Sequence, residues 1–575
     1  MGPVYTTENE CQDCYKCVRH CPVKAIRIVG GKASVIPEAC VSCGECVKVC
    51  PAHAKKIRND LARLRQLLES GAKVYASVAP SFAAYFKGIS IGRLARAMLD
   101  IGFAGVSETA HGAESVSAHV TKLLEEVPGA PILISSACPA AVDMIRKYLP
   151  AWAKFISPLP SPVRAHCRLL HEAYGSDAKV VFFGPCAAKK NEADAHPDEL
   201  ALAVVFPVLR QLLEEHGALP EFAQEDAELA LGPAEEGRFY SVEGGMNDTL
   251  RTGADNVRFV AISGLENLRR LLSGPPPTEK RGRTVFLEAL ACPGGCVNGP
   301  AMEKGATIDD LFDTDAISAL RTSAGRCFAH CGTAAYPAAA VPEPDLDETQ
   351  IAAALARVGK FTKADELNCG ACGYSSCRDF ARALLAGKAE EAMCHNFLRQ
   401  NFQRTSNALI KYIPAAVVIV DGERCISECN RNFADLVGAG EIYETLGNLN
   451  SLAIDDYLAD FGDLFTGALE HGSEIEKFNQ HLGDRIVNIS VFPIARGKYA
   501  GAVIQDVTKN ELHREQIAAR AQEVIRKNVL TVQQVARLFG EHIAETEIML
   551  NEIAGTYTAQ TQAESHGVMH SGGFN

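Results

Sequence analysis

The sequence has no excess of positive charge and no apolar run long enough to cross a bilayer. Its 575 residues carry a formal net charge of −13, so no basic surface for nucleic acid or an anionic membrane is expected. Met1 leads into cysteine-rich sequence without a basic and then apolar leader, which predicts a cytoplasmic chain with no membrane partner. No GxxxxGK loop and no GxGxxG after a strand occur, so neither direct phosphorylation nor direct NAD reduction is expected.

Twenty-one cysteines are present, and most fall in tight groups with two or three residues between them. This is metal-ligand spacing in a reducing compartment. The first two groups, CQDCYKCVRHCP and CVSCGECVKVCP, match the bacterial ferredoxin run, in which three thiolates share a loop and the fourth, expected to begin a helix, points to the other cluster. The predicted ligands are Cys11, Cys14, Cys17 and Cys50 for one [4Fe-4S] cluster, and Cys40, Cys43, Cys46 and Cys21 for the other. Zinc is the alternative for paired CxxC motifs.

Residues 72–333 alternate strand-like apolar runs with helical stretches, which predicts an α/β domain. Three expected strand ends carry cysteines, in SSACPA, FGPCAAKKNEA and LEALACPGGCVNGP: Cys138, Cys186, Cys292 and Cys296. Ordinary buried thiols are the alternative, because free cysteine is common in protein cores. However, CPGGC and a PC followed by two lysines are not core patterns. The two glycines before Cys296 would let the backbone bend closely around bulky inorganic material.

These three segments, in this order, resemble the signature segments of the [FeFe] hydrogenases, and the resemblance spans the middle domain and the ferredoxin-like region before it. It implies that the four cysteines hold a [4Fe-4S] cluster and that Cys296 also bridges to a di-iron unit carrying CO, cyanide and an azadithiolate, together the H-cluster. It implies that Lys189 donates to one cyanide, as a cation beside an anionic ligand should. Ala79, Pro80 and Ser81 match the loop around the other cyanide.

The departures from that family pattern are informative. Catalytic members commonly have a proton-carrying cysteine at the position of Ala137, and alanine cannot carry a proton, so the relay is cut at its last step. Methionines usual in the family are replaced by Gly184 and Leu290, and Pro300 interrupts the glycine run after the last cysteine. The replacement at Ala137 is typical of members that look like sensory hydrogenases.

A third cysteine group follows an Ala/Pro-rich linker at residues 334–349. Its predicted ligands are Cys369, Cys372, Cys377 and Cys394, the last of which returns beyond a helix. The group resembles the small [4Fe-4S] domain of several redox and corrinoid proteins. Zinc is again the alternative, since an isolated four-cysteine site is its usual form.

Residues 405–508 alternate short strands and helices and resemble a PAS domain at the IP start, the Asn430 to Gly438 helix and the closing DVT. Cys425 and Cys429 within it are interpreted as core or free thiols. The long helical stretch that follows has an apolar seam with steps of four and three: Ile525, Val529, Val532, Ala536, Phe539 and Ile543. Such a seam predicts a partner helix and hence a homodimer. Packing of one amphipathic helix on its own PAS domain is the alternative.

The resemblances together imply a sensory [FeFe] hydrogenase that splits H2 slowly and reversibly, with an H-cluster and three additional [4Fe-4S] clusters. Expected partners are H2, ferredoxin or another redox protein, and a downstream kinase or phosphatase-type protein. Two other hypotheses are a catalytic ferredoxin-linked hydrogenase and a redox-sensing signalling protein with cubane clusters only. The expected fold is multidomain α/β and α+β: 1–57 ferredoxin-like, 58–333 hydrogenase, 334–349 linker, 350–401 [4Fe-4S] domain, 402–508 PAS-like, 509–557 dimerisation helix and 558–575 disordered tail.

Overall fold

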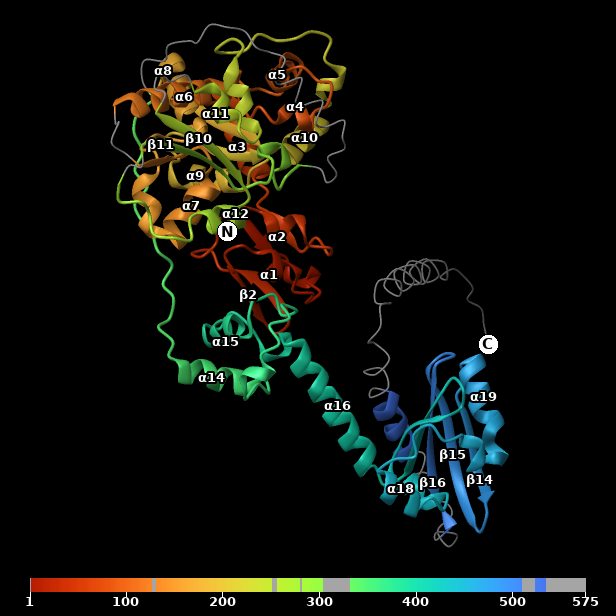
Figure 1. Cartoon of the computed structure of the whole chain (residues 1–575). Helices are drawn as coiled ribbons and strands as arrows, with labels where there is room; N and C mark the ends of the chain where they lie inside the picture. The colour runs from red at the N-terminus through yellow and green to blue at the C-terminus, as the bar shows by residue number, and fades with distance from the viewer. Residues whose placement is uncertain are drawn as a thin grey trace, which may run out of the picture. The chain divides into compact units, whose positions relative to one another are not determined.

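The computed structural model describes residues 2–126, 131–250, 256–279, 282–302, 331–508 and 523–533. The chain divides into two compact units, Met1–Cys394 and His395–Asn575 (Figure 1). Within the described ranges, no helix combines the length and the apolar character needed to cross a membrane.

The N-terminal part of the first unit contains two short antiparallel strand pairs and two short helices. Strand β1 (Val4–Thr6) pairs with β4 (Lys55–Ile57), β2 (Ile26–Val29) pairs with β3 (Lys32–Val35), and the helices are α1 (Lys16–His20) and α2 (Glu45–Lys48). Each helix contains the third cysteine of its group and ends before the fourth, so the expectation that the fourth cysteine begins a helix is wrong. Cys21 follows α1 with an extended backbone, ψ 114°, because the following Pro22 disfavours helical geometry at the residue before it.

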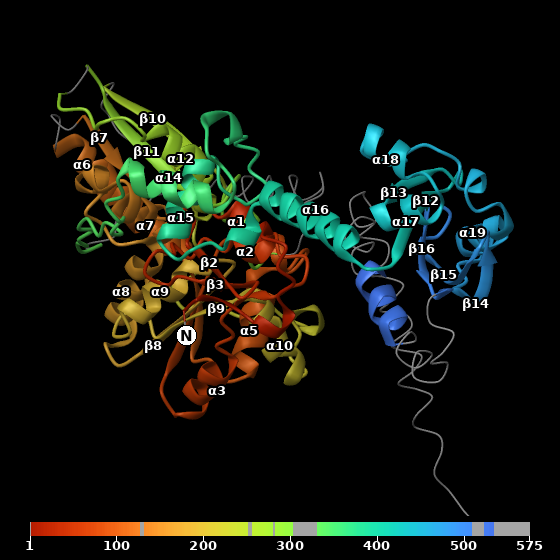
Figure 2. The same ribbon diagram turned by 90° about the horizontal axis from the view of Figure 1, so that it is seen from below.

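The middle part of the first unit contains two fully parallel sheets, which confirms the α/β prediction (Figure 2). The larger sheet has the order β6-β5-β8-β9, from β5 (Val74–Val78), β6 (Gly105–Glu108), β8 (Lys179–Gly184) and β9 (Leu202–Val205). The smaller has the order β10-β11-β7, from β7 (Ile132–Ile134), β10 (Val257–Ser263) and β11 (Thr284–Leu290). All five residues of β5 are buried, as expected for a strand covered on both faces.

Helices connect these parallel strands and bury their apolar faces on the sheets. They are α3 (Leu61–Glu69), α4 (Phe82–Tyr85), α5 (Ile91–Asp100), α6 (Ala110–Glu126), α7 (Pro139–Tyr148), α8 (Pro162–Tyr174), α9 (Ala188–Ala195), α10 (Phe206–Glu215), α11 (Gly245–Thr249) and α12 (Leu265–Leu271). Helices α7 and α9 each begin just after a strand-end cysteine, Cys138 and Cys186. The carboxyl ends of β7, β8 and β11 therefore carry the cysteines, as ligand sites in parallel sheets commonly do.

The last part of the first unit contains α14 (Glu348–Arg357) and α15 (Cys377–Leu385). A capping box fixes the start of α14, where the amide of Gln350 donates to the Asp347 carboxylate at 2.7 Å and the amide of Asp347 donates back to the Gln350 side chain at 3.1 Å. Residues 334–347 before it contain neither helix nor strand, so the linker ends two residues earlier than expected.

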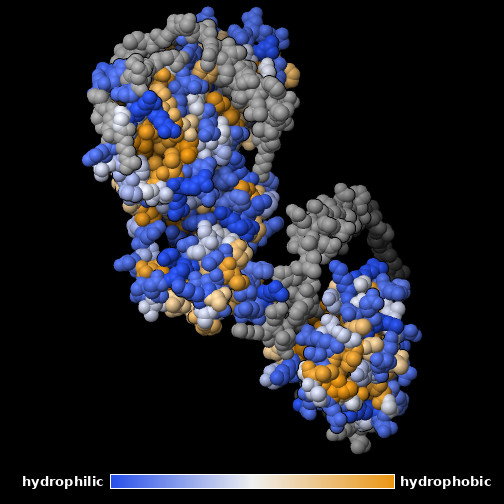
Figure 3. Space-filling model, viewed as in Figure 1, coloured by the Kyte–Doolittle hydropathy of each residue, from blue (hydrophilic) through white to orange (hydrophobic). Residues whose placement is uncertain are grey.

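The second unit is a five-stranded antiparallel sheet preceded by α16 (His395–Tyr412). Its order is β13-β12-β16-β15-β14, from β12 (Ala416–Asp421), β13 (Ile426–Cys429), β14 (Ile475–Leu482), β15 (Arg485–Ala495) and β16 (Tyr499–Asp506), with α17 (Arg431–Leu436), α18 (Gly440–Leu446) and α19 (Gly462–His471). Alternate residues of β12 enter different apolar clusters: Val418 and Val420 pack in one, and Val417 packs in another. Figure 3 shows apolar residues on the visible face over β15 and β16.

The described helical residues 523–533 pack within the second unit. Ile525, Val529 and Val532 are buried in one cluster with Val417 and Phe492 of the sheet. The first half of the predicted dimer seam is therefore covered by the chain's own sheet, which corrects the expectation that these three residues face a partner helix. An apolar helix face can be buried against an apolar sheet as well as against a second helix. Ala536, Phe539 and Ile543, with the expected tail, lie outside the described residues, so the homodimer stays a prediction.

Candidate metal centres

Four strand-end cysteines from distant parts of the sequence line one cavity. Cys138, Cys186, Cys292 and Cys296 line a pocket whose roughly 360 Å³ of space is partly open to solvent. The remaining lining comes mostly from small and apolar residues, and Cys43 of the ferredoxin-like part also contributes. Strand-end positions and the family resemblance predicted these four cysteines as ligands, and the structure brings them together.

The electrostatics of this cavity favour an electron-deficient group between the thiols. Burial, and then the charge of Cys138, raise the pKa of Cys186 to about 11. Burial also raises the pKa values of Cys292 and Cys296, and the neighbouring cysteines raise both further. Cys186, Cys292 and Cys296, which resist deprotonation individually, can become thiolates when iron binds them, because metal coordination replaces the proton. The donor set therefore fits an iron-sulfur cluster.

Among the described residues, no three His, Cys, Asp or Glu side chains lie close enough to hold one metal ion.

The glycines before Cys296 were expected to make room for a bulky inorganic group, but they also make room for the protein's own backbone. Gly294 and Gly295 have φ values of 73° and 106°, where side chains are strained. A Cβ on Gly295 would stand 2.5 Å from the Ser241 carbonyl oxygen and 2.7 Å from the Val242 Cα. The glycine is required because the protein's own backbone passes there, and not only because an inorganic group is bulky.

We expect Gly295→Ala to prevent correct placement of Cys296, because the added methyl group meets backbone that cannot rotate away. The expected result is loss of the cluster of this cavity with retention of the others, measured as iron content and electron paramagnetic resonance (EPR) of the reconstituted chain. Gly282→Ala is the matched control, since Gly282 also has a positive φ, 79°, but has open space where its Cβ would lie. Equal iron content in the two variants would contradict this role of Gly295.

Lys189 and Ser81 lie where the sequence pattern predicted buried polar groups. The Lys189 ammonium donates to Ser161 Oγ at 2.9 Å and to Glu192 Oε2 at 2.6 Å, and its charge favours the thiolates of Cys186 and Cys296. Sequence reasoning missed Glu192, although its i+3 spacing on a helix is a usable signal.

Ser81 belongs to the predicted APS segment, between β5 and α4. It is fully buried, and its hydroxyl has no hydrogen-bond partner among the described residues. A buried hydroxyl without a partner is costly, so a polar ligand group at this point would be stabilised. Ala79 is buried and its amide donates to the Phe183 carbonyl at 2.8 Å, while Pro80 is half-buried.

Of the positions that depart from the family pattern, one lines the cavity, and Ala137 and Gly184 each directly precede a lining residue in the sequence. Ala137 is half-buried and packs with a cluster that includes Met246. Leu290 lines the cavity. At Gly184, an added Cβ would stand 2.4 Å from the Phe182 ring, so a larger side chain does not fit without rearrangement.

Glu288 is a buried acid of this region that sequence reasoning missed. It is 1% exposed, and its Oε2 accepts from the Asn247 amide at 3.2 Å. Burial raises its pKa to about 7, and its charge acts on Cys296. Glu288 could have been recognised from the sequence, because it is a charged residue within the apolar segment FLEALAC.

The ferredoxin-like cysteines separate into the two predicted groups. The pKa of Cys17 is raised to about 11 by burial and by the charges of Cys14, Cys11 and Cys50, although Lys55 opposes the shift. In the other group, the charges of Cys43, Cys21 and Cys40 act on Cys46. The fourth cysteine of each run therefore lies with the first three of the other run.

In the third group, the charges of Cys394 and Cys369 act on Cys372, and burial raises its pKa first. Cys377 is tied to the same loop, since its amide donates to Asn368 Oδ1 at 2.8 Å and its Sγ accepts from the Asn368 amide at 3.4 Å. The structure thus places all four predicted ligands in one small module.

The described part of the second unit contains two cysteines, Cys425 and Cys429. Cys429 is buried in the apolar core of the sheet, and burial raises its pKa to about 11. Cys425 is half-buried, and its amide donates to Asp421 Oδ1 at 2.9 Å. Their places agree with the interpretation as core or free thiols.

Comparisons with known families assign the first unit. Residues 72–300 match the iron only hydrogenase large subunit, C-terminal domain. Residues 3–51 match the 4Fe-4S dicluster domain, and residues 365–395 match a putative Fe-S cluster family. The chain therefore carries a hydrogenase-type domain and iron-sulfur domains, as expected. No curated protein matches the chain.

Several solved structures are similar to parts of the chain. A variant of the [FeFe]-hydrogenase HydA1 from Chlamydomonas reinhardtii is 17% identical, with a TM-score of 0.36, covering 48% of this chain and 99% of its own. A structure of oxygen-inactivated [FeFe]-hydrogenase is 16% identical, with a TM-score of 0.37, covering 49% and 100%. The PAS domain of histidine kinase ThkA is 17% identical, with a TM-score of 0.14, covering 16% and 98%.

Proposed function

We propose that the chain is an H2-sensing [FeFe] hydrogenase of the cytoplasm, in which H2 is split slowly and reversibly. The observation that carries the proposal is the gathering of Cys138, Cys186, Cys292 and Cys296 around one cavity, in a domain that matches the iron-only hydrogenase family. The proposed cofactor is the H-cluster, whose di-iron unit supplies an open iron that polarises H2 and an amine that takes the proton.

The protein's own residues hold and orient this group in the proposal. The four cysteines would hold it as thiolate ligands. Lys189 would turn from Glu192 toward an anionic ligand, and Ser81 would donate to another, which gives its hydroxyl the partner that it lacks among the described residues.

The sensory part of the proposal rests on Ala137 and on the second unit. Alanine offers no proton donor next to the cavity, so turnover should be slow. The antiparallel sheet of the second unit is proposed as a PAS-type relay, whose signal passes to a kinase or phosphatase-type partner. Ferredoxin or another redox protein would exchange electrons with the clusters, and the chain would act as a homodimer.

Infrared spectroscopy of the anaerobically matured chain, under argon and then under H2, tests this proposal together with an H2-oxidation assay. The expected result is CO and cyanide bands that shift under H2, with low turnover. High turnover would establish the alternative of a working catalyst. Absent bands after verified maturation would leave a cubane-only redox sensor.

We expect Ala137→Cys to raise H2 turnover by about 10²-fold, the usual contribution of a positioned proton donor. Ala137→Ser is the matched control, because its hydroxyl is similar in size but is a far weaker acid than a thiol of pKa about 8.5. The H2-oxidation rate with an artificial acceptor measures the effect. Equal rates in the two variants would show that the missing thiol does not limit turnover.

A further inference from the structure

The C-terminal four-cysteine module, residues 365–394, is attached to the ferredoxin-like part by backbone hydrogen bonds. The Ile28 amide donates to the Lys388 carbonyl at 3.1 Å. The Glu390 carboxylate accepts from the amides of Gly30 and Gly31 at 2.5 and 3.2 Å. The module therefore joins the β2-β3 hairpin at specific positions.

The ligand loop of the module approaches α1 very closely. Gly373 has a φ of 92°, and a Cβ added there would stand 2.9 Å from Val18 Cγ1 and 3.1 Å from the Arg19 amide nitrogen. The Arg19 guanidinium donates to the carbonyls of Ala371 and Cys14, at 3.2 and 2.9 Å. A ligand loop of the module thus lies against helix α1, which contains Cys17 and ends at His20, just before Cys21.

Tyr374 is a buried residue next to Gly373 in the same ligand loop. It is 4% exposed, and its hydroxyl makes no hydrogen bond with any described residue. Burial, and then the charges of Cys372 and Cys21, raise its pKa. Both thiols therefore act on one aromatic ring.

Lys24 lies where helix α1 meets the ligand loop of the module. Its ammonium donates to the carbonyls of Val18 and Arg19 at 2.9 and 3.0 Å, the segment on which Gly373 rests. Burial lowers its pKa, while the charges of Cys21 and Cys372 oppose the shift. The charge of one predicted ligand from each group therefore acts on this half-buried cation.

The group that contains Cys21 also reaches the hydrogenase-type cavity. Cys43, a predicted ligand of the same cluster, lines the cavity with the four strand-end cysteines. The site formed by Cys21, Cys40, Cys43 and Cys46 therefore adjoins the cavity at Cys43. It adjoins the four-cysteine module near Cys21.

We propose that the Cys21, Cys40, Cys43 and Cys46 site is a junction at which the electron path from the cavity divides between the N-terminal cluster and the C-terminal module, and that Lys24 tunes both joined sites. This inference rests on the iron-sulfur part of the proposed function. Each transfer moves one electron, so one cluster is oxidised as its neighbour is reduced. Because the module ends at Cys394 and α16 begins at His395, this branch ends at the helix that leads into the second unit.

The test uses the full chain reconstituted with cubane clusters and without a di-iron unit, so it is independent of H2 chemistry. EPR-monitored redox titration gives the midpoint potentials, and Cys372→Ala identifies the module's signal by its loss. Lys24→Gln should lower the potentials of two clusters, because a cation stabilises the more negative reduced state. Lys32→Gln is the matched control, since Lys32 donates to the Cys11 carbonyl at 2.7 Å and should leave the module's potential unchanged.

A Lys24→Gln chain in which the module's potential does not move would overturn the proposal. A second measurement needs no change at Lys24. In the reduced native chain, spin relaxation of the Cys21-group signal should be accelerated by the module's cluster and should slow in Cys372→Ala. Identical relaxation in the two chains would show that the module is not joined at this site, whether or not the chain senses H2.

Discussion

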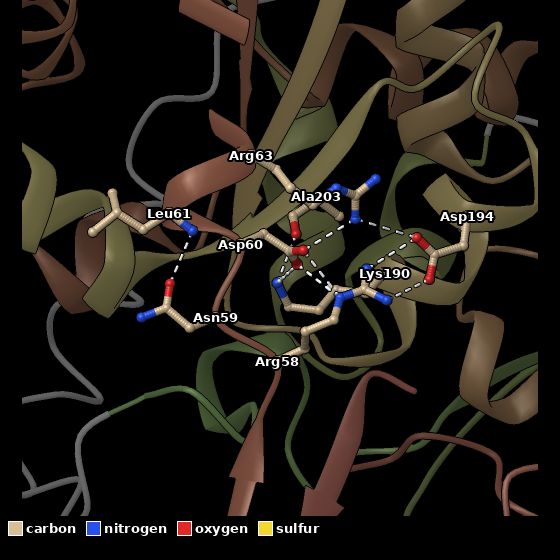
Figure 4. Close-up of polar contacts among 8 residues, drawn as sticks. All are labelled: Arg58, Asn59, Asp60, Leu61, Arg63, Lys190, Asp194 and Ala203. Atoms are coloured by element: carbon tan, nitrogen blue, oxygen red, sulfur yellow. Dashed lines mark hydrogen bonds and ion pairs between the residues drawn. The ribbon is translucent and has the colours of Figure 1, made fainter. Parts of the chain in front are cut away.

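Replacing Lys190 with alanine is expected to destabilise the first unit by about 1–3 kcal/mol, the usual cost of removing buried hydrogen bonds to a charged group. Lys190 is fully buried, and its ammonium donates to Asp60 Oδ2 at 2.7 Å and to the Ala203 carbonyl at 2.8 Å. Arg58 and Arg63 also bind the Asp60 carboxylate (Figure 4). The network joins the segment after β4 to helix α9.

Hydrogen exchange of the full chain, followed by mass spectrometry, measures this effect as faster exchange in α3 and α9. Asp194→Ala is the control from the same network, because the Asp194 side chain is 38% exposed and its ion pair should contribute about 1 kcal/mol or less. The double variant Lys190→Met with Asp60→Leu should recover part of the loss, since it leaves no unpaired charge at these two positions. Equal exchange in Lys190→Ala and Asp194→Ala would contradict the prediction.

The same network gives the stability a dependence on pH. Burial alone would raise the pKa of Asp60, but the hydrogen bond and charge of Lys190 and the charge of Arg58 outweigh it, so the pKa lies below its usual value. The stabilisation is therefore complete above about pH 4 and is lost as the pH falls through the lower folded-state pKa. Acid unfolding should show this loss in the native chain and not in Asp60→Asn.

Replacing Cys292 with alanine is expected to remove one cluster from the reconstituted chain, a loss of about four iron atoms. Cys292 lines the cavity with Cys138, Cys186 and Cys296, and three thiols hold a cubane weakly. In the matured chain, the CO and cyanide bands should disappear with it, because the di-iron unit is proposed to bridge to that cluster.

Cys167→Ala is the matched control for this loss. Cys167 is also fully buried in the hydrogenase-type domain, but it packs in the apolar core of the larger sheet. Iron content and EPR should therefore be unchanged in Cys167→Ala. The proposed cluster would be refuted by native iron content in Cys292→Ala.

Short motifs in the sequence predicted most of the candidate ligands, but they did not predict the buried ion pair that holds the neighbouring segments together. Three short cysteine runs indicated the iron-sulfur groups, because ligands of a cluster recur at fixed intervals along a loop. Lys189 was found through its motif. The buried pair of Lys190 and Asp60 was not, since 130 residues separate the two and each is unremarkable in its own segment.

The errors also have physical reasons. Proline after Cys21 and Cys50 signals the end of a helix, and it was interpreted only as part of a motif. The apolar seam from Ile525 to Val532 has the same spacing whether it meets a helix or a sheet, so periodicity alone does not identify its partner. The choice depends on the apolar outer face formed by Val417 and Phe492, which only the fold reveals.

The contact between Gly44 and Pro300 means that the hydrogenase-type domain is not complete without the ferredoxin-like residues before it. A Cβ on Gly44 would stand 2.3 Å from Pro300 Cβ, so the two segments meet without space between them, and the neighbouring Cys43 forms part of the cavity wall. A truncated chain beginning at residue 58 would keep every strand-end cysteine but would open that wall to water and dissolved oxygen. Shielding of the site thus depends on residues encoded well before the domain that carries its chemistry.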